Sequence, residues 1–399
     1  MWTRRRAVSL LAAGTALPLV LPGVALAAAP TDRRLVVVLL RGALDGLAAV
    51  PPWRDAKYAE VRQGLALDPP GSGDGVLDLD GYFGLHPALA PVHAHYAKGD
   101  LAVFQAVAGP YRDRSHFDAQ DLMENGTTRP RGAADGWLNR ALGTLPGGGH
   151  RLGLAVGQQV PLLLRGDVGV ASWAPRNLPD APPDFLTKLG LLWAGDPLFA
   201  PALAEGMRAQ AMSDEVLGPA QPGAPRRGPA LAALGEPVGK LLAAAGGPRI
   251  AVLEAYGWDT HSQQGKLTGR LATALEQLAG ALDGLARGLG PAWDRTAIVA
   301  ITEFGRTVAP NGTNGTDHGT ATCAFLLGGA VKGGRVLADW PGLAPQNLYE
   351  GRDLRPTVDV RQILKGVLHD HMGVEIAALD RLVFPDSAGA RPLSGLIRT

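Results

Sequence analysis

Carboxylate and imidazole side chains gather in four short polar segments of this chain, most of which directly follow an apolar run. The residues concerned are Asp45, Asp259, His261, Glu303, Asp317 and His318. Oxygen and nitrogen donors of this kind together bind divalent ions such as zinc and manganese. The residue types therefore predict a site for one or two divalent metal ions, with zinc, manganese and calcium as the candidates.

Two closely spaced Asp/His pairs are the most informative part of this pattern. Asp259 and His261 are separated by one residue after a predicted strand, so their side chains are expected to point the same way. Asp317 and His318 are adjacent in a segment rich in glycine and asparagine. Asp317 could bind a metal directly, or it could orient His318 as a hydrogen-bond acceptor.

Three further candidates also have a simple structural interpretation. Asp45 precedes a glycine and fits an ordinary turn residue. Glu303 fits a surface carboxylate paired with Arg306. Ser115 stands directly before a helix predicted over residues 116–124, where a serine commonly caps the first turn. Taken singly, these residues leave the structural and functional alternatives open.

Continuous apolar runs predict the strands that must position these side chains. They span Arg34–Leu40, Leu101–Val107, Arg249–Ala255 and Thr296–Ile301, and their composition is typical of strands buried on both faces. Leucines at helical spacing predict a helix over Lys266–Leu289, which makes a strand–helix–strand unit and hence a parallel pair. Because ligands bind beyond the carboxyl ends of strands in open α/β sheets, the polar residues after these runs are expected at one edge.

The composition indicates one globular α/β domain over residues 30–399. Hydrophobic residues make up 46% of the chain and charged residues 19%, which suffices for a large core and excludes general disorder. Residues 178–246 are rich in proline, alanine and glycine and are expected to form a helical and loop insertion. The formal charge of +1 indicates no nucleic-acid partner, and the single cysteine, Cys323, excludes an internal disulfide.

The N-terminus predicts an export signal over residues 1–29. Basic residues at Arg4–Arg6 precede an uncharged stretch from Ala7 to Leu26, and small residues follow at a site suited to cleavage after Ala27. Glycines and prolines interrupt this stretch, which argues against a membrane anchor. The arginine-rich start resembles the twin-arginine motif. That resemblance implies delivery to the periplasm or the exterior by the twin-arginine export machinery, which carries folded, often metal-loaded, proteins.

Five motifs in order resemble an exported family called domain of unknown function 1501, which looks like a branch of the alkaline phosphatase and sulfatase superfamily. These motifs are Arg41-Gly42-Ala43-Leu44-Asp45-Gly46-Leu47, Arg114-Ser115-His116-Phe117-Asp118-Ala119-Gln120, Gly257-Trp258-Asp259-Thr260-His261, Thr302-Glu303-Phe304-Gly305-Arg306-Thr307 and Gly315-Thr316-Asp317-His318-Gly319. The resemblance implies a three-layer α/β/α sandwich around a mostly parallel central sheet. It also implies a metal-dependent hydrolase that acts on phosphate or sulfate esters.

The resemblance also implies roles for individual residues. Asp45 matches the aspartate that binds metal after the first strand, and Ser115 takes the place of the nucleophile. Asp259 and His261 match one metal site, Glu303 matches the other, and His318 matches a late histidine ligand. His116 and Arg306 are assigned with Ser115 to the catalytic group, and Arg41, Arg114 or Arg306 would counter the charge of a small anionic ester.

One departure from the superfamily pattern keeps a second function open. An Asp-His pair is expected after the late strand, and this chain has Glu303-Phe304 there, so one imidazole ligand is missing. The cysteine signature that sulfatases convert to formylglycine is also absent around Ser115. The alternative is a non-catalytic protein of the same fold that binds a cell-envelope polymer or a co-exported partner protein.

Overall fold

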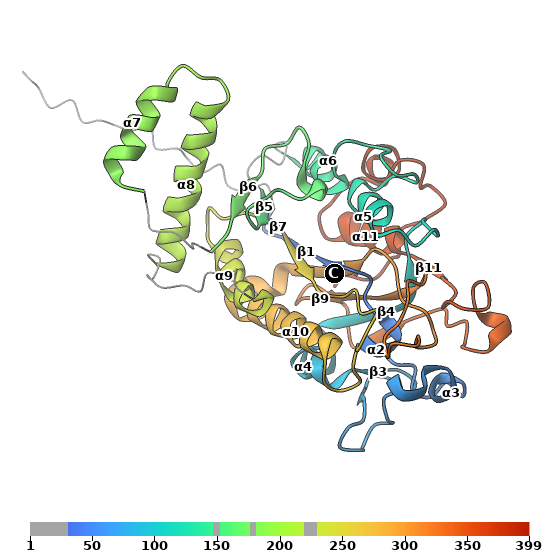
Figure 1. Ribbon diagram of the computed structural model, residues 1–399. Coiled ribbons are helices and arrows are strands. Elements are labelled where there is room, and N and C mark those ends of the chain that lie inside the picture. The colour runs from blue at the N-terminus through green and yellow to red at the C-terminus, as the bar shows by residue number, and fades with distance from the viewer. Residues whose placement is uncertain (1–30, 147–151, 176–180, 219–229, 399) are drawn as a thin grey trace, which may run out of the picture.

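The computed structural model describes residues 31–146, 152–175, 181–218 and 230–398 (Figure 1). The predicted export signal over residues 1–29 lies outside these ranges, as does part of the predicted insertion. A nine-stranded sheet runs through the molecule in the order β10-β4-β9-β8-β1-β7-β5-β6, and β11 pairs with β4. The strands of this sheet are β1 (Arg34–Arg41), β4 (Leu101–Ala108), β5 (Gly153–Val156), β6 (Ala171–Trp173), β7 (Ile250–Tyr256), β8 (Thr296–Thr302), β9 (Thr322–Leu327), β10 (Arg335–Leu337) and β11 (Val358–Asp359). A separate hairpin pairs β2 (Leu77–Asp78) with β3 (Gly84–Leu85).

The sheet is mostly parallel, as predicted. Only β9 runs the other way among the paired strands of this sheet, and it lies antiparallel between β4 and β8. The four predicted central strands are present as β1, β4, β7 and β8. β7 and β8 are parallel to each other but are not neighbours, because β1 lies between them and pairs with both. The connection through the intervening helix therefore skips one strand position.

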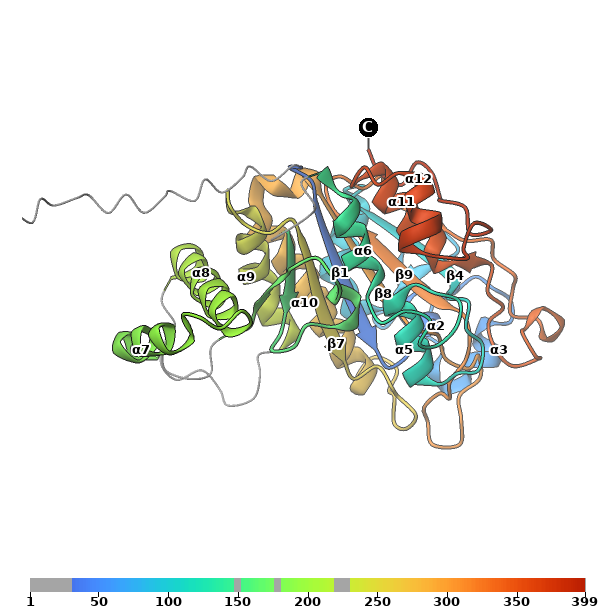
Figure 2. The ribbon, with the colours of Figure 1, turned by 90° about the horizontal axis from the view of Figure 1, so that it is seen from above.

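Helices cover both faces of the sheet and complete three layers (Figures 1 and 2). One face carries α4 (Ala90–Ala97), α9 (Leu231–Ala243) and α10 (Arg270–Leu289), and the other carries α5 (His116–Asn125), α6 (Trp137–Thr144) and α11 (Val360–Asp370). Alternate β1 residues enter the two cores: Val36 and Val38 on the α10 side, Leu35 and Val37 on the other. Burying each such side chain contributes roughly 1.5–3 kcal/mol, so the three-layer α/β/α architecture is confirmed together with its physical cause.

The predicted helix over Lys266–Leu289 begins four residues later, at Arg270, and ends at Gly290 as expected. It starts late because Gly269 before it adopts a φ of +118°, which is outside the helical region. α10 packs closely on α9, and a Cβ at Gly235 of α9 would lie 2.2 Å from the carbonyl oxygen of Ala281. Glycine at this crossing therefore permits the close helix contact.

The predicted insertion contains α7 (Pro183–Trp193), α8 (Phe199–Leu217) and α9 within its described part. α7 and α8 project away from the sheet, and Leu191 and Leu192 of α7 are exposed (Figure 1). The remaining α-helices of the described residues are α2 (Gly46–Ala49), α3 (Tyr58–Arg62) and α12 (Ile376–Ala378). In the described part of the chain, no helix combines the length and apolarity needed to cross a membrane.

The strand directions bring the predicted site segments to one edge of the sheet. β1, β4, β7 and β8 are parallel, so their carboxyl ends share that edge. β9 is antiparallel, so the segment that precedes it returns to the same place. The topology therefore assembles the site from five loops that are far apart in the sequence.

Candidate metal centre

Three imidazoles and one carboxylate meet beyond the carboxyl ends of β1, β7 and β8. The Nε2 atoms of His261 and His318 are 2.9 Å apart. Asp259 Oδ1 lies 3.1 Å from Nε2 of His261 and 3.5 Å from Nε2 of His318, and Asp259 Oδ2 lies 3.6 Å from Nε2 of His116. Ligand atoms of His116, Asp259 and His318 all lie within 4.8 Å of one another. We call these four residues the metal-centre cluster.

Each imidazole of the cluster is oriented through its other ring nitrogen. Nδ1 of His116 lies 2.8 Å from Oε1 of Glu303, and Nδ1 of His261 lies 3.2 Å from Oδ1 of Asp317. Nδ1 of His318 lies 2.8 Å from the carbonyl oxygen of Arg114. An oxygen acceptor at Nδ1 places the ring N–H there and leaves a lone pair on Nε2. Histidine ligands of metal sites are held in this way.

The Nε2 atoms of the cluster fit a cation. The two facing nitrogens of His261 and His318 would repel each other as neutral acceptors at 2.9 Å, and a positive ion bound by both removes that repulsion. Nε2 of His116 is buried and has no hydrogen-bond partner among the described residues. A buried polar atom without a partner is costly, so its direction toward Asp259 is itself an indication of a ligand.

The surroundings of the cluster favour an ionised Asp259 and a neutral His318, which are the forms that bind a metal. Burial disfavours the ionised form of Asp259, but the Arg306 guanidinium at 2.7 Å outweighs it and holds the pKa of this carboxyl below its usual value. Burial, together with the charges of His116, Arg306 and His261, lowers the pKa of His318. The hydrogen bond to Glu303 raises the pKa of His116. A proton therefore competes with a metal for His116, and metal affinity is expected to rise with pH.

Glu303 lies behind His116. It is buried, and its Oε1 accepts hydrogen bonds from the backbone N–H of Gly42 at 2.9 Å, from His116 at 2.8 Å and from Gln120 at 2.9 Å. Burial opposes its ionisation, yet the donors from His116 and Gln120 lower its pKa overall. Glu303 was predicted as a direct metal ligand, and its Oε1 lies against Nδ1 of His116, outside the metal-centre cluster. His116, predicted as catalytic, lies within the cluster.

Asp45 lies in a different buried network. Its Oδ2 accepts from Arg62 at 2.5 Å and from Gln264 at 2.7 Å, and its Oδ1 accepts from the backbone N–H groups of Leu47 and Ala48 at the start of α2. Both oxygens therefore have protein partners, and Asp45 is not a member of the metal-centre cluster. Arg62 follows no motif, so nothing in the sequence indicated this partner.

The two residues of the second Asp/His pair, Asp317 and His318, have different partners. Asp317 is exposed and contacts His261 together with Asn311, whose side-chain N–H donates at 2.9 Å. Its pKa is lowered first by this bond from Asn311. Of the alternatives for Asp317, orientation of a histidine matches the geometry, but the histidine is His261. His318 is oriented by the carbonyl group of Arg114.

Ser115 lies between two residues that contact the cluster. It is the N-cap residue of α5, but its side chain makes no capping hydrogen bond. Arg114 before it adopts a φ of +62°, a conformation that directs its carbonyl oxygen to His318. Backbone strain of this kind is characteristic of functional sites. Ser115 therefore directly precedes a residue of the metal-centre cluster, His116, at the positive end of α5.

The predicted anion-binding arginines are all engaged in ion pairs. Arg306 is buried and binds Asp259 and both the hydroxyl and the carbonyl oxygens of Thr316. Arg41 pairs with Glu124 at 2.8 Å and with Glu254 at 2.5 Å. Arg114 pairs with Asp353 and Glu350. Arg306 therefore positions Asp259, and the cluster itself offers the place for positive charge.

Comparison with known proteins gives similarities of different extent. A crystal structure of Ps i-CgsB in complex with k-i-k-neocarrahexaose is 11% identical with a TM-score of 0.41, and the match covers 91% of this chain and 77% of that one. The C-terminal periplasmic domain of EcEptC from Escherichia coli, in complex with Zn, is 13% identical with a TM-score of 0.33, over 75% of this chain and 74% of that one. No curated protein matches the chain. A family model described as "Protein of unknown function (DUF1501)" matches residues 106–383, which is more than half of the chain.

Proposed function

The chain belongs to the DUF1501 family, as its motifs predict, and we propose that this member is an exported, metal-dependent hydrolase of phosphate or sulfate esters with Ser115 as nucleophile. One observation carries the proposal. Three imidazoles, each oriented through Nδ1, turn their Nε2 atoms toward Asp259. Ser115 directly precedes one of them, His116, at the start of α5, and its side chain makes no capping hydrogen bond. This arrangement combines a cation site with a hydroxyl group.

His116, His261, His318 and Asp259 would hold the ion, and their donors suit zinc or manganese. Three nitrogens and one oxygen match the mixed ligand sets of zinc. Calcium, which takes six to eight oxygen ligands, does not match this set. The four residues form one group, so we propose one tightly held ion. When bound, it supplies a Lewis acid that lowers the pKa of a nearby hydroxyl and offsets negative charge on the ester.

In this proposal the chain supplies the nucleophile. Ser115 Oγ forms a bond to phosphorus or sulfur while the bond to the alcohol oxygen of the ester breaks, and the serine proton passes to the departing alcohol. Water then cleaves the seryl ester, which restores Ser115 and releases phosphate or sulfate. Ser115 stands between Arg114 and His116 in the sequence, the carbonyl group of Arg114 orients His318, and Arg306 keeps Asp259 ionised.

Export accounts for the N-terminal sequence. Arg4–Arg6 and the uncharged stretch after them support cleavage near Ala27 and passage by the twin-arginine machinery to the periplasm or exterior. This route carries folded proteins, so the metal can be inserted before export. Residues 30–399 then act as one domain.

The metal part of the proposal is tested by plasma mass spectrometry of mature protein purified after native export. We expect one zinc or manganese ion per chain, and loss of the metal in Asp259→Ala and His318→Ala. His93→Ala, outside the cluster, is the matched control and should keep the metal. A folded parent protein without stoichiometric metal would contradict the site.

The catalytic part is tested with Ser115→Ala on a panel of aryl phosphate and sulfate esters. This variant should keep its metal and its fold while turnover falls roughly 10³-fold or more. Full hydrolytic activity of Ser115→Ala would exclude the serine as nucleophile. Stoichiometric metal without turnover of any ester by the parent would instead favour the non-catalytic cell-envelope binding protein.

A further inference from the structure

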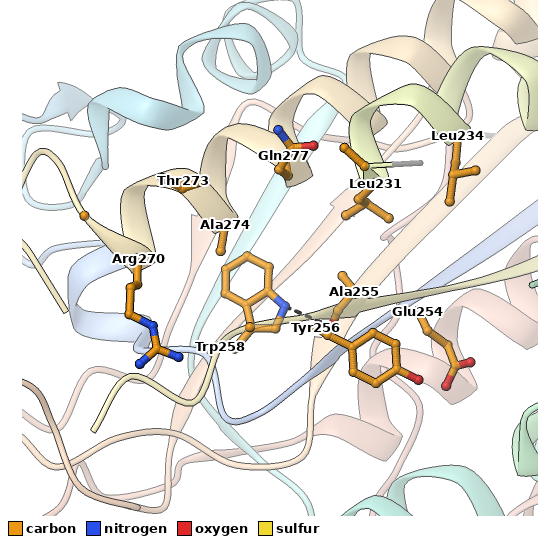
Figure 3. A pocket seen from close by; sticks show the side chains of 13 residues that line it. Leu231, Leu234, Glu254, Ala255, Tyr256, Trp258, Arg270, Thr273, Ala274 and Gln277 are labelled. Carbon is orange, nitrogen blue, oxygen red and sulfur yellow. Dashed lines mark hydrogen bonds between the residues drawn. The ribbon is translucent and has the colours of Figure 1, made fainter. Parts of the chain in front are cut away.

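A groove of about 680 Å³ opens between the end of β7 and helices α9 and α10 (Figure 3). Its volume lies in the range of small-molecule sites. β5 pairs with β7 only as far as Leu253, and no strand of the described residues pairs with Glu254–Tyr256 on that side. Trp258 follows this edge and donates its indole N–H to the carbonyl oxygen of Ala255 at 3.1 Å.

The groove combines an apolar wall with hydrogen-bond donors. Leu231, Leu234 and Ala274 line it from α9 and α10. Gln277 uses its Oε1 to accept the backbone N–H of Ala232 at 3.3 Å, which leaves its NH₂ group as a donor. Arg270 is exposed at one end of the groove. A ligand with an apolar face and several oxygen acceptors matches this lining.

An exposed aromatic ring stands at the rim. Tyr256 is 68% exposed, although it directly follows a buried strand segment. Aromatic rings exposed in this way offer a large, rigid and apolar contact surface with a polar end. The C–H face of a sugar ring packs on such a surface, while its hydroxyl oxygens accept from donors like those of Gln277 and Arg270.

The groove is linked to the metal-centre cluster along the chain. Gly257 and Trp258 of its lining directly precede Asp259. Glu254 also binds Arg41, whose Nη1 donates to Gln120 at 3.0 Å, and Gln120 donates to Glu303, which orients His116. A ligand in the groove therefore lies against Glu254, the first residue of this series of contacts, and against the two residues that directly precede Asp259.

We propose that this groove binds a sugar ring and that the substrate is an anionic saccharide ester, with its phosphate or sulfate group at the metal-centre cluster. The saccharide assignment rests on the groove alone, and the position of the ester group rests on the proposed function. The groove contributes affinity for the part of the substrate that does not react.

The proposal is tested by binding of N-acetylglucosamine and its 6-phosphate and 6-sulfate to metal-free mature protein, followed by ligand-observed NMR. Metal-free protein separates sugar binding from hydrolysis. We expect all three sugars to bind, and Tyr256→Ala and Gln277→Leu to weaken binding by at least about 10-fold, roughly the loss of one good contact. Phe185→Ala removes an exposed ring of α7 and is the matched control, which should bind as the parent does.

Several results would overturn the assignment. The assignment fails if none of the three sugars binds, if both groove variants bind them as the parent does, or if inorganic phosphate alone displaces them. It also fails if the sugars bind only after deletion of residues 219–229, because the groove would then be assigned to the chain itself. Failure of the metal or Ser115 tests together with sugar binding that Tyr256→Ala removes would reject the hydrolase and retain the saccharide site.

Discussion

Glu303→Gln tests whether a buried carboxylate controls the metal-centre cluster through His116. The change keeps the shape of the side chain, and an amide oxygen at the Oε1 position can still accept from Gly42, His116 and Gln120. The new NH₂ group lies where Oε2 is 2.8 Å from the Thr302 hydroxyl, which can accept a hydrogen bond. The fold is therefore expected to persist, while the negative charge that orients His116 is lost.

The expected effect is a loss of metal affinity. Removing a carboxylate partner of a histidine ligand weakens metal binding about 10- to 100-fold, which corresponds to about 1.4 to 2.7 kcal/mol. The pKa of His116, which Glu303 raises, should fall in the metal-free variant. Zinc affinity is measured by competition with a chromophoric chelator, and the His116 pKa by NMR titration.

A matched control is Glu124→Gln, which removes a buried carboxylate that binds Arg41 and contacts no histidine of the cluster. Its zinc affinity should equal that of the parent. If folded Glu303→Gln bound zinc as tightly as the parent, the role of Glu303 as the orienting partner of His116 would be refuted.

Three further changes separate structural from functional roles. Asp45→Asn should destabilise the protein by about 3–5 kcal/mol in urea unfolding, because it leaves the Arg62 guanidinium buried without its partner, and yet metal stoichiometry should not change. Burial lowers the pKa of His371 to about 4, so the unfolded chain takes up a proton before the folded protein does as pH falls below about 6.5. The folding stability that His371 contributes above that pH is therefore lost toward pH 4. In metal-free urea unfolding between pH 7.5 and 4.5, the free energy of unfolding of His371→Gln should fall by up to about 3 kcal/mol less than that of the parent. Gly42→Ala should lower zinc affinity, because its Cβ would lie 2.7 Å from the backbone nitrogen of Asp259 at a φ of +121°.

Each of these changes has its own control and contrary result. Loss of zinc in folded Asp45→Asn would restore Asp45 to the ligand set. His93→Gln should keep the pH dependence of the free energy of unfolding that the parent has. The same pH dependence in His371→Gln would refute the role of the buried His371 imidazole. Gly64→Ala places a Cβ where no heavy atom lies within 4 Å and should leave zinc binding intact; the same result for Gly42→Ala would contradict the close approach.

Much of the fold follows from local pattern. Residues of β1 alternate between two cores, and a run apolar at every position, such as Leu35–Leu40, can satisfy both faces only as a central strand. The strand neighbours could not be predicted, since β1 lies between β7 and β8 and this order depends on contacts across the whole sheet. Ser115 shows the same limit, because its position at the start of α5 was predictable and its lack of a capping bond was not.

The sequence by itself determined which segments meet, because polar residues that follow buried strands are brought to one edge by strand direction alone. Only the tertiary structure decided which side chains contact one another there. Glu303 lies against His116 and Asp45 against Arg62, because the partner of a carboxylate is the nearest donor in space. That donor comes from a distant part of the chain, and residue type and spacing along the chain do not encode its distance.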